Sequence, residues 1–446
     1  MPDTRFNFSP DRFREITSDV LAKARARGAS AAETEVSESI GKSVTVRQGE
    51  VETIEYTRDK GLSLTVYIGQ QRGHASSTDL SPQAISDTID KALTIARFTA
   101  ADECAGLADE DLLAKSIPDL DLYRPWGVSV ERSIELAQVC EAAAFDVDKR
   151  ITNSEGASVG THDAHFVYAN SLGFSGGYPS SRHHISCAVI AGKDDAMQRD
   201  DWYTSARDPE SLEPAQTIGT IAGQRALRRL GARKSETMQA PVLFEAPLAT
   251  GLLGHLVSAA SGGNLYRKSS FLVDALGKTV FSPRVTIAEQ PHLPRGLAST
   301  AFDEEGVATR TRNVVEAGVL QGYFLGTYSG RKLGMRSTGN AGGNHNLVLE
   351  PGEMGFEALL RHMGRGLLVT ELLGMGVNMV SGDYSRGAAG FWIEDGAIAY
   401  PVEEVTIASN LKDMFLGIEA VGADVMVRGS RISGSVLIGQ MTIAGE

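Results

Sequence analysis

The sequence has few cysteines, no long apolar run and no excess of basic residues, and each shortage excludes a class of protein. No apolar stretch approaches the ~20 residues that a membrane span needs. The three cysteines (Cys104, Cys140 and Cys187) are isolated and give neither a disulfide framework nor paired metal spacing. The polar N-terminal stretch lacks an apolar signal core, so export is not expected. A reducing cytoplasm fits these absences.

The charge balance is acidic. Asp and Glu number 56 against 43 Lys and Arg, and the formal net charge is −13. Nucleic-acid binders need a basic face that displaces counterions from phosphates. The densest basic run, residues 225–234, ends a predicted helix, where cations complement the helix macrodipole. We therefore expect neither a nucleic-acid partner nor a membrane partner.

The chain is long enough for two or three domains with sizeable cores. Serine followed by apolar residues at helical spacing predicts helices beginning near Ser9 and Ser81 and running from Ser129 to about Phe145. A further helix is expected over 214–230. Strand-like runs occupy 43–47, 51–56 and 62–68, and short strands with turns are expected over 151–206.

These elements predict an α+β fold, because helices and hairpins are interspersed without regular βαβ alternation. We expect an N-terminal α/β domain (1–100), a linker (101–128), a central α/β domain (129–236) and a C-terminal domain (237–446). The last is rich in strands and glycine. Two apolar-Glu-x-Gly-x-apolar segments, 315–320 and 393–398, predict hairpins with glycine at the turn, and Gly374-x-Gly376 predicts a plain turn.

Two histidine pairs stand in the central block, His162 with His165 and His183 with His184. A zinc site would need further ligands at suitable spacing, and none is near. We predict histidines of strands or turns that are partly exposed to solvent.

Two glycine-rich segments, 337–345 and 381–390, predict loops. Small residues allow a peptide backbone to approach closely, and strand edges accept a peptide as an added strand. The alternative is tight loop packing or a subunit contact. The candidate peptide-binding or interface residues there are Asn340, Asn344, His345, Tyr384 and Arg386.

A further stretch, 246–271, begins after an apolar run and turns at Pro247. It predicts a short helix of small residues that carries His255, a break at 262–264, and a basic knot that includes Arg267 and Lys268. These two basic residues are also candidates for peptide or partner contact.

Four long blocks carry a resemblance to a known family: 249–272 (ATGLLGHLVSAASGGNLYRKSSFL), 291–307, 331–346 and 382–396. They resemble the TldD/PmbA family, and its PmbA (TldE) type more closely than its TldD type. The resemblance implies a zinc-dependent metallopeptidase of two subunit types, with a strand-rich C-terminal domain that bears the site. Members of the family are also labelled modulators of DNA gyrase.

The active TldD type reads His-Glu-x-x-x-His where this chain has Thr250, Gly251 and, last, His255. The resemblance also implies a late cysteine as third ligand, and none follows Cys187. A catalytic zinc normally needs three protein ligands and an open position, and a nearby carboxylate to take the proton of its water. We therefore expect no metal and no catalytic residue in this chain, with His255 as a packed helix histidine.

The resemblance implies a PmbA-type subunit that forms a heterodimer with a TldD-like subunit holding the zinc, and possible homodimers of the chain alone. The substrates that it implies are unfolded proteins or small peptides, including peptide precursors. One alternative is a self-sufficient hydrolase using His255 with Ser258 or Ser261, but no G-x-S-x-G pattern surrounds either serine. Another is a non-enzymatic regulator of a toxin–antitoxin or gyrase-related system, for which the acidic balance disfavours DNA contact.

Overall fold

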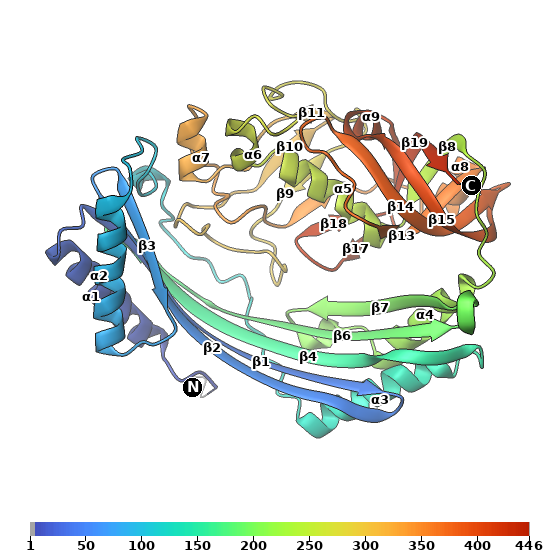
Figure 1. Cartoon of the computed structure of the whole chain (residues 1–446), viewed down its shortest axis with the longest axis horizontal. Helices are drawn as coiled ribbons and strands as arrows, with labels where there is room; N and C mark the ends of the chain where they lie inside the picture. The colour runs from blue at the N-terminus through green and yellow to red at the C-terminus, as the bar shows by residue number, and fades with distance from the viewer. Residues whose placement is uncertain (1–4, 446) are drawn as a thin grey trace.

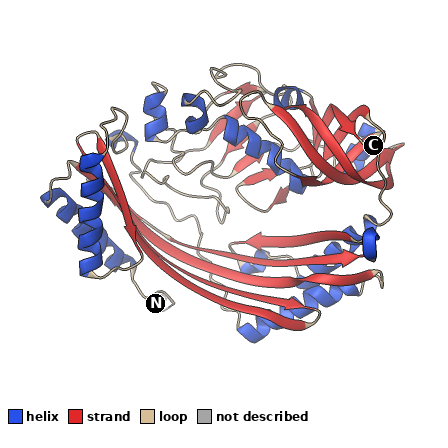
Figure 2. Ribbon diagram, in the orientation of Figure 1, coloured by secondary structure: helices blue, strands red, loops and turns tan. Residues whose placement is uncertain are grey.

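The computed structural model describes residues 5–445; the start of the polar N-terminal stretch (1–4) and residue 446 lie outside it. A long curved sheet forms the base of the molecule, and the C-terminal part lies over its concave face (Figure 1). Helices and mostly antiparallel strands are mixed, and the C-terminal part is built mainly of strands (Figure 2). The α+β prediction is confirmed. Within the described residues, no helix is long and apolar enough to cross a bilayer.

The first two helices begin where the sequence predicts. Ser9 and Ser81 accept hydrogen bonds from backbone N–H groups three residues on, and a proline follows each of them. The buried faces consist of the apolar residues at helical spacing, from Phe13 to Ala24 and from Ile85 to Ala96. These helices are α1 (Pro10–Ala26) and α2 (Pro82–Phe98).

The curved sheet has the strand order β3-β2-β1-β4-β6-β7, with β5 beside β4 and every neighbouring pair antiparallel. The strands are β1 (Ala31–Arg47), β2 (Glu50–Ile68), β3 (Gln71–Ser77), β4 (Ile151–Asn170), β5 (Ser175–Gly176), β6 (Pro179–Ala191) and β7 (Gln198–Ala206).

The runs 43–47, 51–56 and 62–68 do lie in strands, but these strands and those of 151–206 are longer than predicted, because polar side chains hide the strand pattern. β1 alternates between buried and half-buried positions from Ala31 to Ser39, although the half-buried ones are mostly Glu and Ser. The first eleven residues of β2 are exposed, so that segment is held by main-chain pairing with β1 rather than by burial.

Strands from the two expected N-terminal domains join in this one sheet. β1 pairs with β4 from Glu33 opposite Asn170 to Val46 opposite Ala157. Each half nevertheless keeps its own apolar core on the convex side: α1 and α2 cover one half, and α3 (Val130–Phe145) and α4 (Ala215–Arg228) cover the other (Figure 1).

The segment expected as a linker is fixed to the C-terminal part. It contains only one short 3₁₀ turn, Glu110–Leu112. Arg331 donates to Leu107 O at 2.7 Å and pairs with Asp109, and Tyr328 donates to Asp102 at 2.7 Å. The linker is therefore part of the interface between the curved sheet and the C-terminal part.

The C-terminal part contains two further sheets, ordered β11-β10-β9-β12-β18-β17 and β15-β14-β13-β8-β19-β16. In the second, β15 also pairs with β19, so β8, β13, β14, β15 and β19 form a closed ring. The strands are β8 (Met238–Phe244), β9 (Ile287–Glu289), β10 (Arg312–Glu316), β11 (Val319–Leu320), β12 (Leu347–Leu349), β13 (Gly366–Leu373), β14 (Asp383–Glu394), β15 (Ala397–Asn410), β16 (Ile418–Val421), β17 (Met426–Val427), β18 (Arg431–Ser433) and β19 (Val436–Ala444).

One apolar core joins both of these sheets to a central helix. Leu252, Leu253 and Leu256 of that helix share the core with Phe244 and Leu347. The helices of this part are α5 (Ala246–Ala259), α6 (Gly262–Tyr266), α7 (Thr327–Lys332), α8 (Phe356–Met363) and α9 (Leu411–Leu416).

Both predicted hairpins are present. Their turns, Ala317-Gly318 and Asp395-Gly396, have positive φ at both residues, as a two-residue hairpin turn requires.

Three local predictions are wrong. Residues 383–390 form the start of β14 rather than a loop, because they pair with β15. The expected break at 262–264 is helical in α6, and it follows a turn at Ala260 and an isolated bridge from Ser261 to Phe324. His165 and His183 are buried rather than partly exposed; His183 lies between Thr161 and the backbone of Arg124.

Candidate functional site

The helix that carries the altered motif is regular. Thr250 Oγ1 donates to the backbone oxygen of Pro247 at 2.9 Å, one turn earlier. No heavy atom lies within 4 Å of a β-carbon built on Gly251. Each residue of an α-helix turns by about 100°, so positions 250 and 255 point about 140° apart. The side chains at these two positions therefore cannot meet at one metal ion.

His255 is surrounded by cations rather than by ligands. Its ring meets the Tyr384 ring edge-on, with centroids 5.8 Å apart. Burial, followed by the charges of Arg386 and Arg431, lowers the pKa of His255 to about 4. Arg431 lies across α5 at Gly254, where a β-carbon would collide with its guanidinium group. A histidine in this setting is neutral at pH 7, but a metal cation would meet two guanidinium charges.

These residues do not fit the zinc ion that the family resemblance implies for the active type. Threonine and glycine stand where a ligand and a base would be, and the remaining histidine adjoins two arginines. Across residues 5–445, no group of three or more His, Cys, Asp or Glu side chains is arranged to hold a metal ion.

Tyr384 and Arg386 lie beside His255 rather than in a glycine-rich loop. Tyr384 is buried, and burial raises the pKa of its hydroxyl to about 12. Arg386 is half-buried, and its Nε has no hydrogen-bond partner.

Arg267 and Lys268 follow α6 and are exposed. Arg267 Nη1 donates to the Tyr266 hydroxyl at 2.9 Å, and its guanidinium lies 5.1 Å from the centre of that ring. Lys268 has a φ of 56°, which ends the helix by turning the chain. Tyr266 lines a cavity together with Gly342 and Gly343, so Arg267 and Lys268, which follow it in the chain, lie near the glycine-rich loop.

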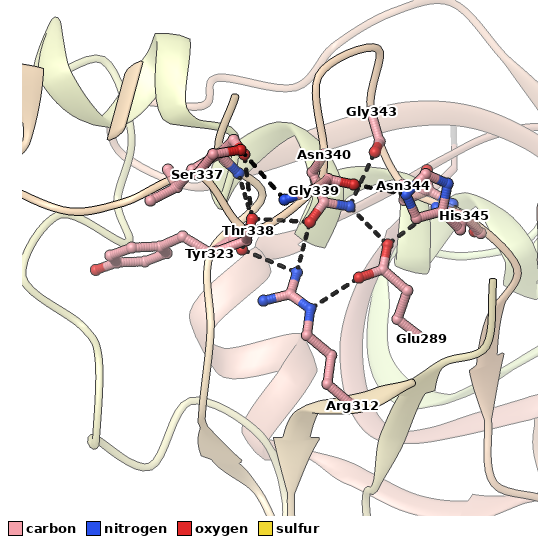
Figure 3. A network of polar contacts seen from close by, with 11 residues as sticks. Glu289, Arg312, Tyr323, Ser337, Thr338, Gly339, Asn340, Gly343, Asn344 and His345 are labelled. Atoms are coloured by element: carbon pink, nitrogen blue, oxygen red, sulfur yellow. Dashed lines mark hydrogen bonds and ion pairs between the residues drawn. The ribbon is translucent and has the colours of Figure 1, made fainter. Parts of the chain in front are cut away.

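The glycine-rich loop 337–345 is held by a buried carboxylate (Figure 3). Glu289 is 1% exposed and accepts from Arg312 Nε at 2.8 Å, Asn340 Nδ2 at 2.7 Å and the backbone N–H of His345 at 2.9 Å. Arg312 also donates to Asn340 Oδ1 at 3.1 Å, and His345 Nε2 lies 2.7 Å from Gly339 O. Asn340 and His345 are therefore structural partners of this network.

Sequence reasoning missed Glu289 and Arg312. The available signal was one acidic residue at the end of a short apolar run, 285–289, because such a carboxylate must find partners when the strand is buried. The partners themselves come from elements 23 to 56 residues away in sequence.

A cavity of about 260 Å³ separates the other side of this loop from the curved sheet. Glu35, Phe166 and Tyr168 line it from the sheet, and Asp303 and Gly342 line it from the C-terminal part. Burial and the charge of Glu305 raise the pKa of Asp303 to about 7. A second cavity of about 510 Å³ shares residues 341–343 with the first. Together they give the loop an aromatic and acidic surrounding.

Asn344 joins the loop to a neighbouring turn. Its Nδ2 donates to Ser430 O at 3.2 Å, and Leu347 N donates to the same oxygen at 2.8 Å. The turn that contains Ser430 leads into β18 and Arg431, so the glycine-rich loop and the surroundings of His255 are mechanically connected.

Comparison with known sequences identifies the family. Profiles of the PmbA/TldA metallopeptidase match three segments: domain 1 at 32–96, the central domain at 123–230 and the C-terminal domain at 237–445. The chain belongs to the PmbA/TldD family. It is 51% identical to the metalloprotease PmbA of Escherichia coli O157:H7, over 96% of this chain and 94% of that protein. A metalloprotease PmbA homolog of Haemophilus influenzae is 48% identical, over 97% and 96%.

Solved structures share the architecture. A protein of Bacteroides thetaiotaomicron named as a modulator of DNA gyrase superposes with a TM-score of 0.93 at 28% identity, covering 98% of this chain and all of that chain. TldE of Thermococcus kodakarensis gives a TM-score of 0.86 at 21% identity, over 96% of this chain and all of that chain, and shows the same fold. The curved sheet and the strand-rich C-terminal part are therefore features of the PmbA/TldD fold.

Proposed function

We propose that this chain is the non-catalytic, PmbA (TldE)-type subunit of a zinc metallopeptidase. The proposal rests mainly on the two arginines, Arg386 and Arg431, that lie beside His255, the only histidine of the altered motif. In this proposal the zinc belongs to a TldD-like subunit. This chain completes the heterodimer and shapes access for unfolded proteins or small peptides.

Three further properties belong to the same proposal. The chain works in the cytoplasm, which its three buried free cysteines support. It pairs with itself when the partner is absent, since one surface serves both pairings. It binds no nucleic acid, in keeping with the net charge of −13.

We also propose a division of the chain into domains. Residues 1–100 and 129–236 would act as two lobes of one curved sheet, each with its own core. Residues 237–446 would act as the unit that carries the altered site and faces the partner.

A region of exposed apolar residues supports partner binding by the C-terminal part. The end of β13 exposes Leu373 by 51%, and the segment that joins β13 to β14 exposes Met375 by 92% and Val380 by 59%. Apolar side chains gathered on one segment are typical of a protein–protein contact.

The partner test is co-purification of this chain with a TldD-like subunit of the same organism. A stable pair should form and bury well over ~1,000 Å². Met375→Asp should weaken the pair. The matched control is Phe98→Asp, which changes a side chain that is 88% exposed on the N-terminal helix α2. Lack of association at micromolar concentrations would refute the subunit role.

The metal test is elemental analysis of the chain after native purification, with the TldD-like subunit as positive control. The control should hold zinc, and this chain should hold far less than one zinc per molecule. One tightly bound zinc that disappears in His255→Ala would overturn the assignment.

A further inference from the structure

A cavity of about 240 Å³ lies between β7, the first half of α5 and the turn from β17 to β18. Its polar lining comes from Tyr203, Thr250, Arg428, Ser430 and Arg431. All five side chains are half-buried, so the cavity reaches the solvent. It borders the altered motif through Thr250 but lies apart from the two cavities around the glycine-rich loop.

Neither arginine of this cavity forms an ion pair within residues 5–445, although the charges of Glu213 and Asp201 act on Arg428 from a distance. Arg431 Nε and Arg428 Nη2 are buried without any hydrogen-bond partner. Arg225, which is also half-buried, pairs by contrast with both Asp200 and Glu245. A buried donor on a charged group is costly when it is left unsatisfied, on the order of 1–3 kcal/mol or more. Because both arginines also line the cavity, an anion bound there would supply the charge partner that they lack.

Both guanidinium groups are held in place before any ligand arrives. The Arg428 guanidinium lies 3.8 Å from the centre of the Trp202 ring and 4.3 Å from that of Tyr203. Arg431 is confined by α5 at Gly254. The turn between them is fixed through Ser430 O, which accepts from Leu347 N at 2.8 Å. Groups ordered in advance lose little entropy on binding.

We propose that this cavity binds the C-terminal carboxylate of a peptide. Planar guanidinium groups pair with carboxylates through two parallel hydrogen bonds, and Tyr203 and Ser430 add hydroxyl groups. Pro247 and Met426 form apolar walls for the side chain of the last peptide residue. The peptide as source rests on the proposed function, whereas the need for an oxyanion rests on the arginines alone.

The experiment measures binding of N-acetyl-trialanine to the full chain without any partner, by calorimetry and by intrinsic tryptophan fluorescence, to which Trp202 beside Arg428 contributes. The free acid should bind at least ~10-fold more tightly than its C-terminal amide, the ratio expected for one charge-assisted hydrogen bond. Arg428→Met and Arg431→Met should remove this preference. The matched control Arg132→Met changes an exposed arginine of α3 and should retain it.

Equal binding of acid and amide, or no binding of the acid at millimolar concentration, would overturn the proposal. Inorganic phosphate that binds as tightly as the acid would overturn the assignment to a peptide. If either variant fails to fold, the acid–amide comparison on the wild-type chain still decides. Association with a TldD-like subunit is scored separately, so loss of carboxylate binding with an intact pair refutes this inference and leaves the proposed function standing.

Discussion

The buried carboxylate of Glu289 gives the sharpest stability prediction, through the substitution Arg312→Met. Methionine keeps much of the apolar stem but removes the donor to Glu289 Oε2 at 2.8 Å. The carboxylate is 1% exposed, so water cannot replace the lost partner. Breaking a buried ion pair from one side costs about 3–5 kcal/mol. Two donors to Oε1 remain, from Asn340 and His345, and we expect a loss near the lower end of that range.

The measurement is urea unfolding together with amide hydrogen exchange in 337–346. Exchange should accelerate in that loop and stay unchanged in α1. The control Arg132→Met breaks an ion pair with Glu135 whose side chains are both more than half exposed, so its cost should be below about 1 kcal/mol. The double variant Arg312→Met with Glu289→Gln should lose less than the sum of the single losses, because the stranded charge is gone. A loss no larger than that of Arg132→Met, with loop exchange unchanged, would refute the reasoning.

Three further predictions concern the helices. Gly219→Ala should destabilise the fold by several kcal/mol in chemical unfolding, because the new β-carbon would overlap the backbone oxygen of Cys140. Gly251→Ala, whose β-carbon meets no atom, should stabilise the fold by about 0.5–1 kcal/mol. The reverse order of stabilities would contradict this packing. A histidine whose folded pKa is about 4 stabilises the fold when neutral, so the wild type should lose on the order of 3 kcal/mol as pH falls from about 6.5 to 4. His255→Leu should lack this component, and parallel pH profiles would exclude the effect. The double variant Thr250→His with Gly251→Glu should show no chelator-sensitive peptide hydrolysis with added zinc, and turnover near that of a TldD-type enzyme would show that only the side chains were missing.

The helices were predictable because their signals are local. A capping serine, a proline after it and apolar residues at helical spacing fall within one short segment, as at Ser9 and Phe13. The hairpin at Asp395-Gly396 was predictable for the same reason, because the turn type requires positive φ. The altered motif at Thr250 and Gly251 was likewise evident in the sequence.

The long strands and the loop network were not predictable from local signals. Residues 50–60 are exposed along β2, so no apolar alternation marks them. Their strand exists because β1 offers a complete row of main-chain partners. Glu289, Arg312 and Asn340 meet only after β9, β10 and the loop are assembled, and no spacing in the sequence encodes that meeting.

The arginines change how the altered site is understood. Arg386 comes from β14 and Arg431 from β18, so two strands with distant sequence positions supply the charge around the imidazole that α5 carries. If two metal ligands alone were lost, the site would be uncharged, and substitutions that restore the ligands would restore metal binding. The two guanidinium groups weaken metal binding further, because a divalent cation must overcome their repulsion in a partly buried site. We therefore expect this site to disfavour zinc, and we expect that restoring a metal would require removal of Arg431 as well as new ligands.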